Sequence, residues 1–409
     1  MNPAKPSTRH HFFSPCPRGL ESVLEAELHN IGARQIHSIP GGVHYQGTWK
    51  LCYTVNLESR IASRVLWFLD QTSYAHEQDI YRTTFQLPWP HWFSSRATIK
   101  VKVKTKHCPL RSVNFVALRI KDAICDKFIH ETGTRPNVRT DDPDIQIHAY
   151  VDQHTFTLYL DTSGAPLFKR GFRIDQGNAP LRENLAAGIL ALSGWTPDQT
   201  LLDPMCGSGT ILLEAAQKAR RIAPGLHRHF TFEKFLHFDQ RTWTALRQIS
   251  QSLQIPSMPI TLHGYDRDAA ELEKARTNIQ AAGLSEGIHL QEADALTIHP
   301  PTEQGILLTN PPYGIRSGER DQLAAFYPQL GNHLKQQFPG WQAYFLTADA
   351  RLAKLIGLAA SRRTPLYNGD LECRLFEFKM VRGHNRKSTR QHQPPPPLQH
   401  ERRPNASHI

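Results

Sequence analysis

One segment of sixteen residues constrains the fold more than any other. It begins at Leu201 and reads LLDPMCGSGTILLEAA: an apolar strand, an acid, a turn containing Gly207 and Gly209, and then a helix. Glycines allow tight turns and close approach of a ligand to the backbone. The order is typical of an open α/β sheet, whose ligands bind at the carboxyl ends of the strands. A tight turn without a ligand is the alternative, but the strand and helix context favours the ligand.

The surrounding sequence repeats this alternation of strands and helices. Short apolar runs separated by helical patterns lie at residues 200–202, 260–265, 288–290, 305–308, 343–346 and 375–380. Alternation of this kind predicts a doubly wound parallel sheet with helices on both faces. We therefore expect residues 163–382 to form an α/β domain of the Rossmann type.

The first part of the chain mixes strands and helices differently. Residues 1–50 predict a small α+β unit, and residues 51–162 predict a second α+β module with helices at 51–68 and 115–129. Residues 383–409 are basic and rich in proline, with too little apolar surface to offset the entropy of ordering. We expect this tail to be disordered.

The balance of charge favours a polyanionic partner. Lys and Arg number 48 against 37 Asp and Glu, a formal net charge of +11. No apolar run approaches the ~18 residues that cross a bilayer, and no secretory signal begins the chain, so we expect a cytoplasmic protein without a membrane partner. The six cysteines form no C-x-x-C pair and the histidines show no ligand spacing, so we expect no metal.

Three acids follow successive predicted strands, namely Asp203, Asp266 and Asp294. Each alone is more often a helix cap, but three at one edge of a sheet favour a pocket. Asp203 suits an amino group, Asp266 the two hydroxyls of one ribose, and Asp294 the amino group of adenine. The third glycine and the nearby acid of a dinucleotide site are missing. The pattern therefore favours a cofactor with a single nucleoside.

The segment TNPPYG, from Thr309, directly follows a predicted strand. Two prolines hold the backbone rigid and extended. Asn310 and the carbonyl of Pro311 can then accept hydrogen bonds from an exocyclic amine, while Tyr313 beyond Pro312 offers a flat ring for stacking a base. Catalysis here would come from positioning and electrostatics. An ordinary Asn-Pro turn is the alternative, and the position after an apolar strand favours function.

Lysines alternate with apolar residues in IKVKVKTK, from Ile99. A strand would place Lys100, Lys102, Lys104 and Lys106 on one outer face, where ammonium groups can contact phosphates. Solvated edge strands also use lysines to prevent aggregation. The strand pattern alone leaves both interpretations open.

Taken together, these motifs resemble the THUMP-domain Rossmann-fold RNA methyltransferases, in particular the bacterial 23S ribosomal RNA guanine-N2 methyltransferases. The resemblance covers nearly all of residues 12–380 and rests on LLDPMCGSGT, GYDRD, EADAL, TNPPYG, GGVHYQG, RPNVRTDDPDIQIH and LFKRGFR. It implies a class I (Rossmann-like) methyltransferase domain at 163–382, preceded by a ferredoxin-like unit at 1–50 and a THUMP domain at 51–162.

The resemblance also implies roles for individual residues. S-adenosylmethionine would be bound by Asp203, Gly207, Gly209, Asp266 and Asp294. The target amine would be held by Asn310, Pro311, Pro312 and Tyr313. RNA would be contacted by the four lysines and by Arg135, Arg139, Lys169 and Arg170. The expected partner is large-subunit ribosomal RNA or an assembly intermediate that contains it.

Two departures from the family pattern stand out. Ile315 occupies a position where the family often has Glu, which leaves any role of that acid in doubt. No second methyltransferase domain follows, so a single modification is expected.

The sequence leaves three alternative functions open. Related THUMP enzymes share the pocket motifs and act on transfer RNA. Adenine-N6 methylases of DNA also use Asn-Pro-Pro-Tyr, although an RNA-binding module disfavours them. The third is a non-catalytic RNA-binding or assembly protein, which the intact acids and Asn-Pro-Pro-Tyr disfavour.

Overall fold

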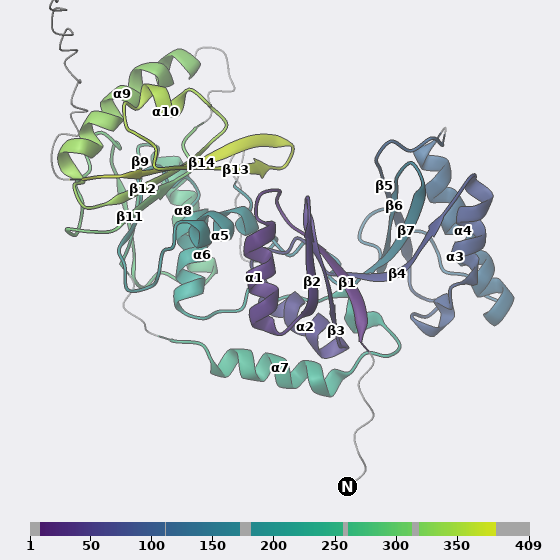
Figure 1. Cartoon of the computed structure of the whole chain (residues 1–409). Coiled ribbons are helices and arrows are strands. Elements are labelled where there is room, and N and C mark those ends of the chain that lie inside the picture. Colours follow the sequence, from purple (N-terminus) through teal and green to yellow (C-terminus); the bar gives the residue numbers. More distant parts are fainter. Residues whose placement is uncertain (1–8, 111, 172–180, 257–260, 313–318, 382–409) are drawn as a thin grey trace, which may run out of the picture.

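The computed structural model describes residues 9–110, 112–171, 181–256, 261–312 and 319–381. Two seven-stranded sheets organise these residues, one in each half of the chain (Figure 1). The tail at 383–409 that we expect to be disordered lies outside the described residues, as do Tyr313 and Ile315. Among the helices of the described part, none has the length and apolar character needed to span a membrane.

The first sheet is continuous across both N-terminal modules. Its strands lie in the order β2-β3-β1-β4-β7-β6-β5. Strand β4 pairs with β1 on one side and with β7 on the other, which joins the two modules. The strands are β1 (His10–Pro15), β2 (Arg34–Ile39), β3 (Gly42–Gly47), β4 (Leu66–Ser73), β5 (Ile99–Thr105), β6 (Ile145–Val151) and β7 (Thr155–Asp161).

The helices of this half cover one face of the sheet. Phe12, Tyr45 and Leu160 are buried on that face, in the same apolar core as the inner sides of the helices. Burial of this continuous apolar surface is the main force that holds the half together. The helices are α1 (Glu21–Ile31), α2 (Trp49–Glu58), α3 (Glu77–Gln86) and α4 (Val113–Thr132), with a short 3-10 turn at Trp89–His91.

The helix expected at residues 51–68 is wrong in its second half. Helix α2 ends at Glu58, and Leu66 already belongs to β4. A short apolar run fits a helix or a strand equally well from the sequence. Here the run is a strand because Leu66, Trp67 and Phe68 pair with β7, a segment more than ninety residues further along the chain.

The second sheet has the order β10-β9-β8-β11-β12-β14-β13. Six strands run in one direction, but β14 runs antiparallel to both of its neighbours, β12 and β13. The sheet is therefore mixed, whereas the sequence predicts a wholly parallel one. The short turn between β13 and β14 allows only a hairpin, because a parallel pair needs a long crossover. The strands are β8 (Leu201–Asp203), β9 (Leu262–Asp266), β10 (Ile288–Glu292), β11 (Ile306–Thr309), β12 (Gln342–Thr347), β13 (Arg362–Asn368) and β14 (Leu371–Lys379).

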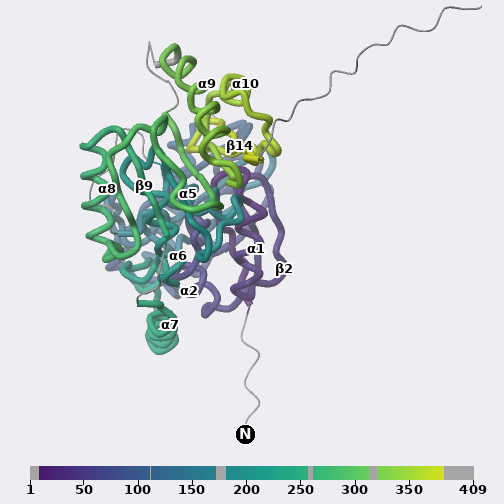
Figure 2. The backbone as a smooth tube through the Cα atoms, turned by 90° about the vertical axis from the view of Figure 1, so that its left-hand side faces the viewer, coloured from purple at the N-terminus to yellow at the C-terminus, as the bar shows by residue number. Residues whose placement is uncertain are grey.

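The strand order reverses between β8 and β11. In an open α/β sheet this switch point opens a crevice at the carboxyl ends of the strands. Helix α7 contacts α2 of the other half and protrudes below the molecule (Figure 2). The helices of this half are α5 (Glu183–Leu192), α6 (Thr210–Ala219), α7 (Gln240–Ser252), α8 (Ala269–Ala281), α9 (Glu319–Gln337) and α10 (Leu352–Leu355), with a 3-10 turn at Thr231–Lys234.

A buried ion cluster ties the two halves together. Arg170 is 2% exposed, and its Nε donates to Glu214 Oε1 of α6 at 3.0 Å. Its Nη2 donates to the carbonyl of Arg60 at 2.8 Å, and Arg60 Nη1 lies 3.5 Å from Glu214 Oε2. The prediction that Arg170 contacts RNA is therefore wrong, because its guanidinium is used inside the protein. Lys169 beside it is exposed.

Candidate active site

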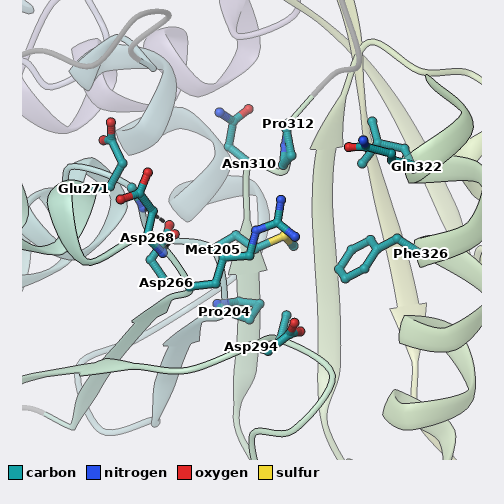
Figure 3. Close-up of a pocket in the computed structure, with 14 residues that line it drawn as sticks. Pro204, Met205, Asp266, Asp268, Glu271, Asp294, Asn310, Pro312, Gln322 and Phe326 are labelled. Carbon is teal, nitrogen blue, oxygen red and sulfur yellow. Dashed lines mark hydrogen bonds between the residues drawn. The ribbon is translucent and has the colours of Figure 1, made fainter. Parts of the chain in front are cut away.

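A cavity of about 430 Å³ opens at the carboxyl ends of β8, β9 and β11. Its size lies within the range of small-molecule sites. Five residues singled out from the sequence line it: Gly207, Asp266, Asp294, Asn310 and Pro312. In Figure 3, Asp266 and Asp268 lie on one side of the open space, Gln322 and Phe326 on the other, and Asn310 and Pro312 between them.

Three other described residues of the expected set, Asp203, Gly209 and Pro311, do not line this cavity. Asp203 is 2% exposed at the end of β8, and Pro311, which follows Asn310 in the chain, is buried. Gly209 precedes α6, where an added Cβ would lie 3.2 Å from Ala275 Cβ of α8. Gly209 therefore permits close packing between two helices, whereas Gly207 faces the cavity.

The glycine turn is fixed by a carboxylate from the next strand. Gly207 has a φ of +50°, a conformation that strains other residues, and its N–H donates to Asp266 Oδ2 at 2.9 Å. Asp266 Oδ1 accepts the backbone N–H of Asp268 at 3.0 Å. The bonds orient the Asp266 carboxylate at the cavity wall and leave lone pairs for a ligand.

Asp294 is held in a similar way after β10. Its Oδ1 accepts the backbone N–H of Leu296 at 2.8 Å, and the side chain lines the cavity. An ionised carboxylate has about four acceptor sites, so acceptor capacity remains. Asp266 and Asp294 thus present two anchored acceptors, which suit hydroxyl or amino groups.

The Asp203 carboxyl is buried under the turn. Burial, with a smaller contribution from the Asp266 charge, raises the pKa of Asp203 to about 7, although Thr309 and the backbone N–H of Met205 act in the opposite direction. Its Oδ1 accepts that N–H at 3.2 Å. A cationic group brought next to Asp203 would favour the ionised form.

This raised pKa gives a test of stability against pH. The pKa of about 7 in the folded protein lies above the usual aspartate value of 3.8, so folding favours the protonated acid and stability falls as the pH rises from about 4 to 7. The expected loss is roughly 4 kcal/mol at most. In Asp203→Asn this part of the decline should disappear. Urea unfolding of the wild-type protein and of Asp203→Asn at pH 5 and pH 8 measures the difference. An equal loss of unfolding free energy in the two proteins would show that the pKa of Asp203 does not cause the decline.

Asn310 lies at the end of β11, half-buried and on the cavity wall. The Pro-Pro segment after it is anchored from α9, because Tyr327 Oη donates to the Pro312 carbonyl at 3.5 Å. Tyr327 is fully buried, and this burial raises its pKa to about 12. The side chain of Asn310 is thus presented by a strand end and a rigid backbone.

Comparison with known sequences identifies the family to which this architecture belongs. Residues 170–377 match the RMKL-like methyltransferase domain, residues 74–161 the THUMP domain, and residues 11–66 the RlmL ferredoxin-like domain. The chain belongs to the RMKL-like methyltransferase family. Its fold class is thereby confirmed: a Rossmann-like methyltransferase domain preceded by ferredoxin-like and THUMP modules.

Relatives of this RMKL-like methyltransferase carry RNA-related names. A candidate RNA methyltransferase of Synechocystis is 38% identical over 91% of this chain and 98% of its own length. The ribosomal RNA large subunit methyltransferases K/L of Shewanella baltica and Methylococcus capsulatus are 37% and 39% identical over 93% and 92% of this chain. The chain spans about half the length of these two proteins, 54% and 52%.

Solved structures share the whole architecture. A methyltransferase complexed with S-adenosylhomocysteine is 27% identical, with a TM-score of 0.85 over 93% of this chain and 100% of that one. A predicted N6-adenine-specific DNA methylase of Listeria monocytogenes is 28% identical, with a TM-score of 0.82 over 91% of this chain and 96% of that one.

Several residues on the cavity wall of this RMKL-like methyltransferase were not predicted from the sequence. Gln322 and Phe326 of α9 are four residues apart, which puts them on one face of the helix. The sequence predicts this helix but not which face turns toward the cavity. Met205, Arg267, Glu271 and Leu323 also line the site. Among the described residues, no group of three or more side chains suits a metal ion.

The basic residues expected to contact RNA lie at different places. Lys102 and Lys104 of β5 line a second cavity of about 720 Å³. The Lys100 ammonium instead donates to the carbonyl of Thr140. Lys106, Arg135 and Arg139 are exposed, and Arg139 lies 4.0 Å from Asp141. Strand β5 is an edge strand, so its lysines also fit the alternative of protecting a free edge.

Proposed function

We propose that this chain uses S-adenosylmethionine to methylate the exocyclic N2 amine of a guanine in 23S ribosomal RNA. One observation carries the proposal: Asn310 lies on the same cavity as Gly207, Asp266 and Asp294. The residues expected to bind the donor and the residue expected to hold the acceptor amine therefore face one space.

The lining residues fit the proposed cofactor. Asp266 offers acceptors to ribose hydroxyls, and Asp294 offers them to the adenine amino group. Met205, Leu323 and Phe326 add apolar surface suited to a flat ring. S-adenosylmethionine, when bound, supplies a methyl group activated by a sulfonium sulfur. A structure of the same architecture was solved with S-adenosylhomocysteine, which supports this choice.

Asn310 and Pro311 would orient the target amine. The amine lone pair of guanine is delocalised into the ring, which makes it a poor nucleophile. An N–H bond to Asn310 Oδ1 on the cavity wall favours a pyramidal nitrogen with its lone pair free. The Pro311 carbonyl is proposed as the second acceptor, although Pro311 itself is buried and does not line the cavity. Pre-organised acceptors of this kind act by positioning and electrostatics, so no strong general base is required. Pro312 keeps the backbone rigid, and Tyr313 is proposed to stack on the base.

The chain's relatives and domains support ribosomal RNA as the proposed substrate. The K/L relatives are named for large-subunit ribosomal RNA, and a THUMP domain occupies residues 74–161. Guanine N2 is the specificity that the motif resemblance implies. The proposed RNA contacts are Lys102, Lys104, Lys106, Arg135, Arg139 and Lys169, all of which are at least partly exposed. Lys100 is proposed as a weaker contact because its ammonium already bonds to a carbonyl.

Methyl transfer to defined nucleic acids tests the proposal. The protein is incubated with tritiated S-adenosylmethionine and RNA from cells that lack it, supplied as 23S RNA, pre-ribosomal particles or transfer RNA, with DNA in parallel. Mass spectrometry of nucleosides should reveal N2-methylguanosine in 23S RNA. Label in transfer RNA would favour the tRNA enzyme, and N6-methyladenine in DNA would favour the DNA methylase. Absence of both transfer and cofactor binding would favour a non-catalytic protein.

A further inference from the structure

The face of the first sheet that lies opposite its helices carries a group of aromatic rings. Ring centroids are 4.6 Å apart for Phe13 and His44, 5.9 Å for Phe13 and Tyr159, and 5.9 Å for Phe68 and Tyr159. Tyr150 of β6 is 36% exposed and lines the same two cavities as Tyr159. We call Phe13, Phe68, Tyr150 and Tyr159 the aromatic row.

Strand register places the aromatic row opposite the core. Phe13 pairs with His44, and Phe68 pairs with Tyr159. Directly opposite residues share a face, and neighbours along a strand alternate. Phe12 and Leu160, the sequence neighbours of Phe13 and Tyr159, are fully buried on the face that the helices cover.

The aromatic row is accessible at several points. Phe13 and Phe68 are half-buried, whereas Tyr159 is only 9% exposed. The rings lie beside hollows of about 340 and 720 Å³ that share Tyr150 and Tyr159. The outer face of a half-covered antiparallel sheet is normally polar. Exposed aromatic surface in a hollow is typical of a binding site.

Positive charge borders the larger hollow. Arg18, Lys104 and Arg182 are exposed there, and Lys102 is half-buried beside them. Arg64 also lines the hollow, but its charge is largely balanced by the buried Asp161. Burial, followed by the charge of Arg64, lowers the pKa of Lys102. Asp370 is the one acid on this lining among the described residues. The hollow therefore suits a polyanion.

We propose that the aromatic row and its basic border bind an unpaired stretch of the substrate RNA. The proposal rests on the proposed function, which supplies RNA as the partner. Aromatic rings can stack on any base, but only where the base is not enclosed in a duplex. Lys102 and Lys104 stand at the edge of the row, where they can contact phosphates while the rings contact bases.

Binding of a labelled RNA tests this surface. Fluorescence anisotropy is measured on the full chain with an unpaired 12-nucleotide RNA and with the same RNA annealed to its complement. Stacking contributes roughly 1–3 kcal/mol per base, so the combined Phe68→Leu and Tyr150→Leu variant should bind unpaired RNA at least about tenfold more weakly. The combined Lys102→Gln and Lys104→Gln variant should reduce the slope of log K against log[salt] by about 1.4.

Matched variants on the helical face provide the control. Phe115 of α4 is 47% exposed and Lys50 of α2 is exposed, so Phe115→Leu and Lys50→Gln should leave binding unchanged. Equal affinity for the paired RNA, or an unchanged affinity in the aromatic variant, would overturn the proposal. Binding of S-adenosylmethionine by calorimetry separates the two questions. RNA binding that depends on the row supports this surface even if the cofactor does not bind, an outcome that would count against the proposed function alone.

Discussion

Replacing Asn310 with Ala should lower the rate of methyl transfer by about 10³-fold, near the upper range for removal of one pre-organised polar group. The side chain lies on the cavity wall after β11, where its Oδ1 is proposed to accept an N–H of the target amine. Affinity for S-adenosylmethionine should change by less than about twofold, because Asp266 and Asp294 are the proposed anchors. Single-turnover transfer and calorimetry on the same preparation measure both quantities.

Two further variants sharpen this test. Asn332 is exposed on α9, so Asn332→Ala should transfer methyl groups at the wild-type rate. Asn310→Asp keeps an acceptor oxygen at the Oδ1 position and should retain more activity than Asn310→Ala. If Asn310→Ala methylates RNA at the wild-type rate, the proposed contact with the amine is wrong.

Glu214→Gln should lower the free energy of unfolding by about 3–5 kcal/mol, the usual cost of removing one partner from a buried ion pair. The side chains of Glu214 and Arg170 are fully buried, 3.0 Å apart, and Arg60 lies 3.5 Å from the same carboxylate. Without that charge, the guanidinium groups of Arg170 and Arg60 would remain close together, and Arg60 would be left with Glu27 as its neighbouring anion. Urea unfolding at pH 7 measures the change.

A surface pair gives the matched control. Glu273 and Arg276 of α8 lie 3.3 Å apart with side chains 71% and 45% exposed, so Glu273→Gln should cost less than about 1 kcal/mol. Similar losses in Glu273→Gln and Glu214→Gln would show that the cluster between the two halves does not stabilise the fold.

The parts of the site that the sequence predicts follow from local patterns. An acid, a glycine turn or an Asn-Pro-Pro segment directly after an apolar run needs no distant contact to be recognised. Gly207, Asp266, Asp294 and Asn310 accordingly line one cavity. The local pattern does not distinguish a glycine that faces a ligand from one that permits packing. Gly209 belongs to the same pattern, but it allows α6 to pack against α8.

The predictions that were wrong concern residues whose structure is set by contacts between distant segments. Leu66 begins a strand, and not the end of a helix, because β7 pairs with it. Nothing in the sequence around Arg170 distinguishes it from an exposed basic residue, because its partner Glu214 lies 44 residues away on α6. Neither contact leaves a local signal.

By itself, the sequence determined six of the seven strands in the second half, all except β13, and the polar residues at the strand ends, because alternation and turn chemistry are local. Only the tertiary structure decided which of those residues share a cavity, which arginine is buried, and that four rings from β1, β4, β6 and β7 lie on one open face. The physical reason is that burial and strand register are set by pairing between segments far apart in the chain, and a side chain's face changes with a shift of a single residue.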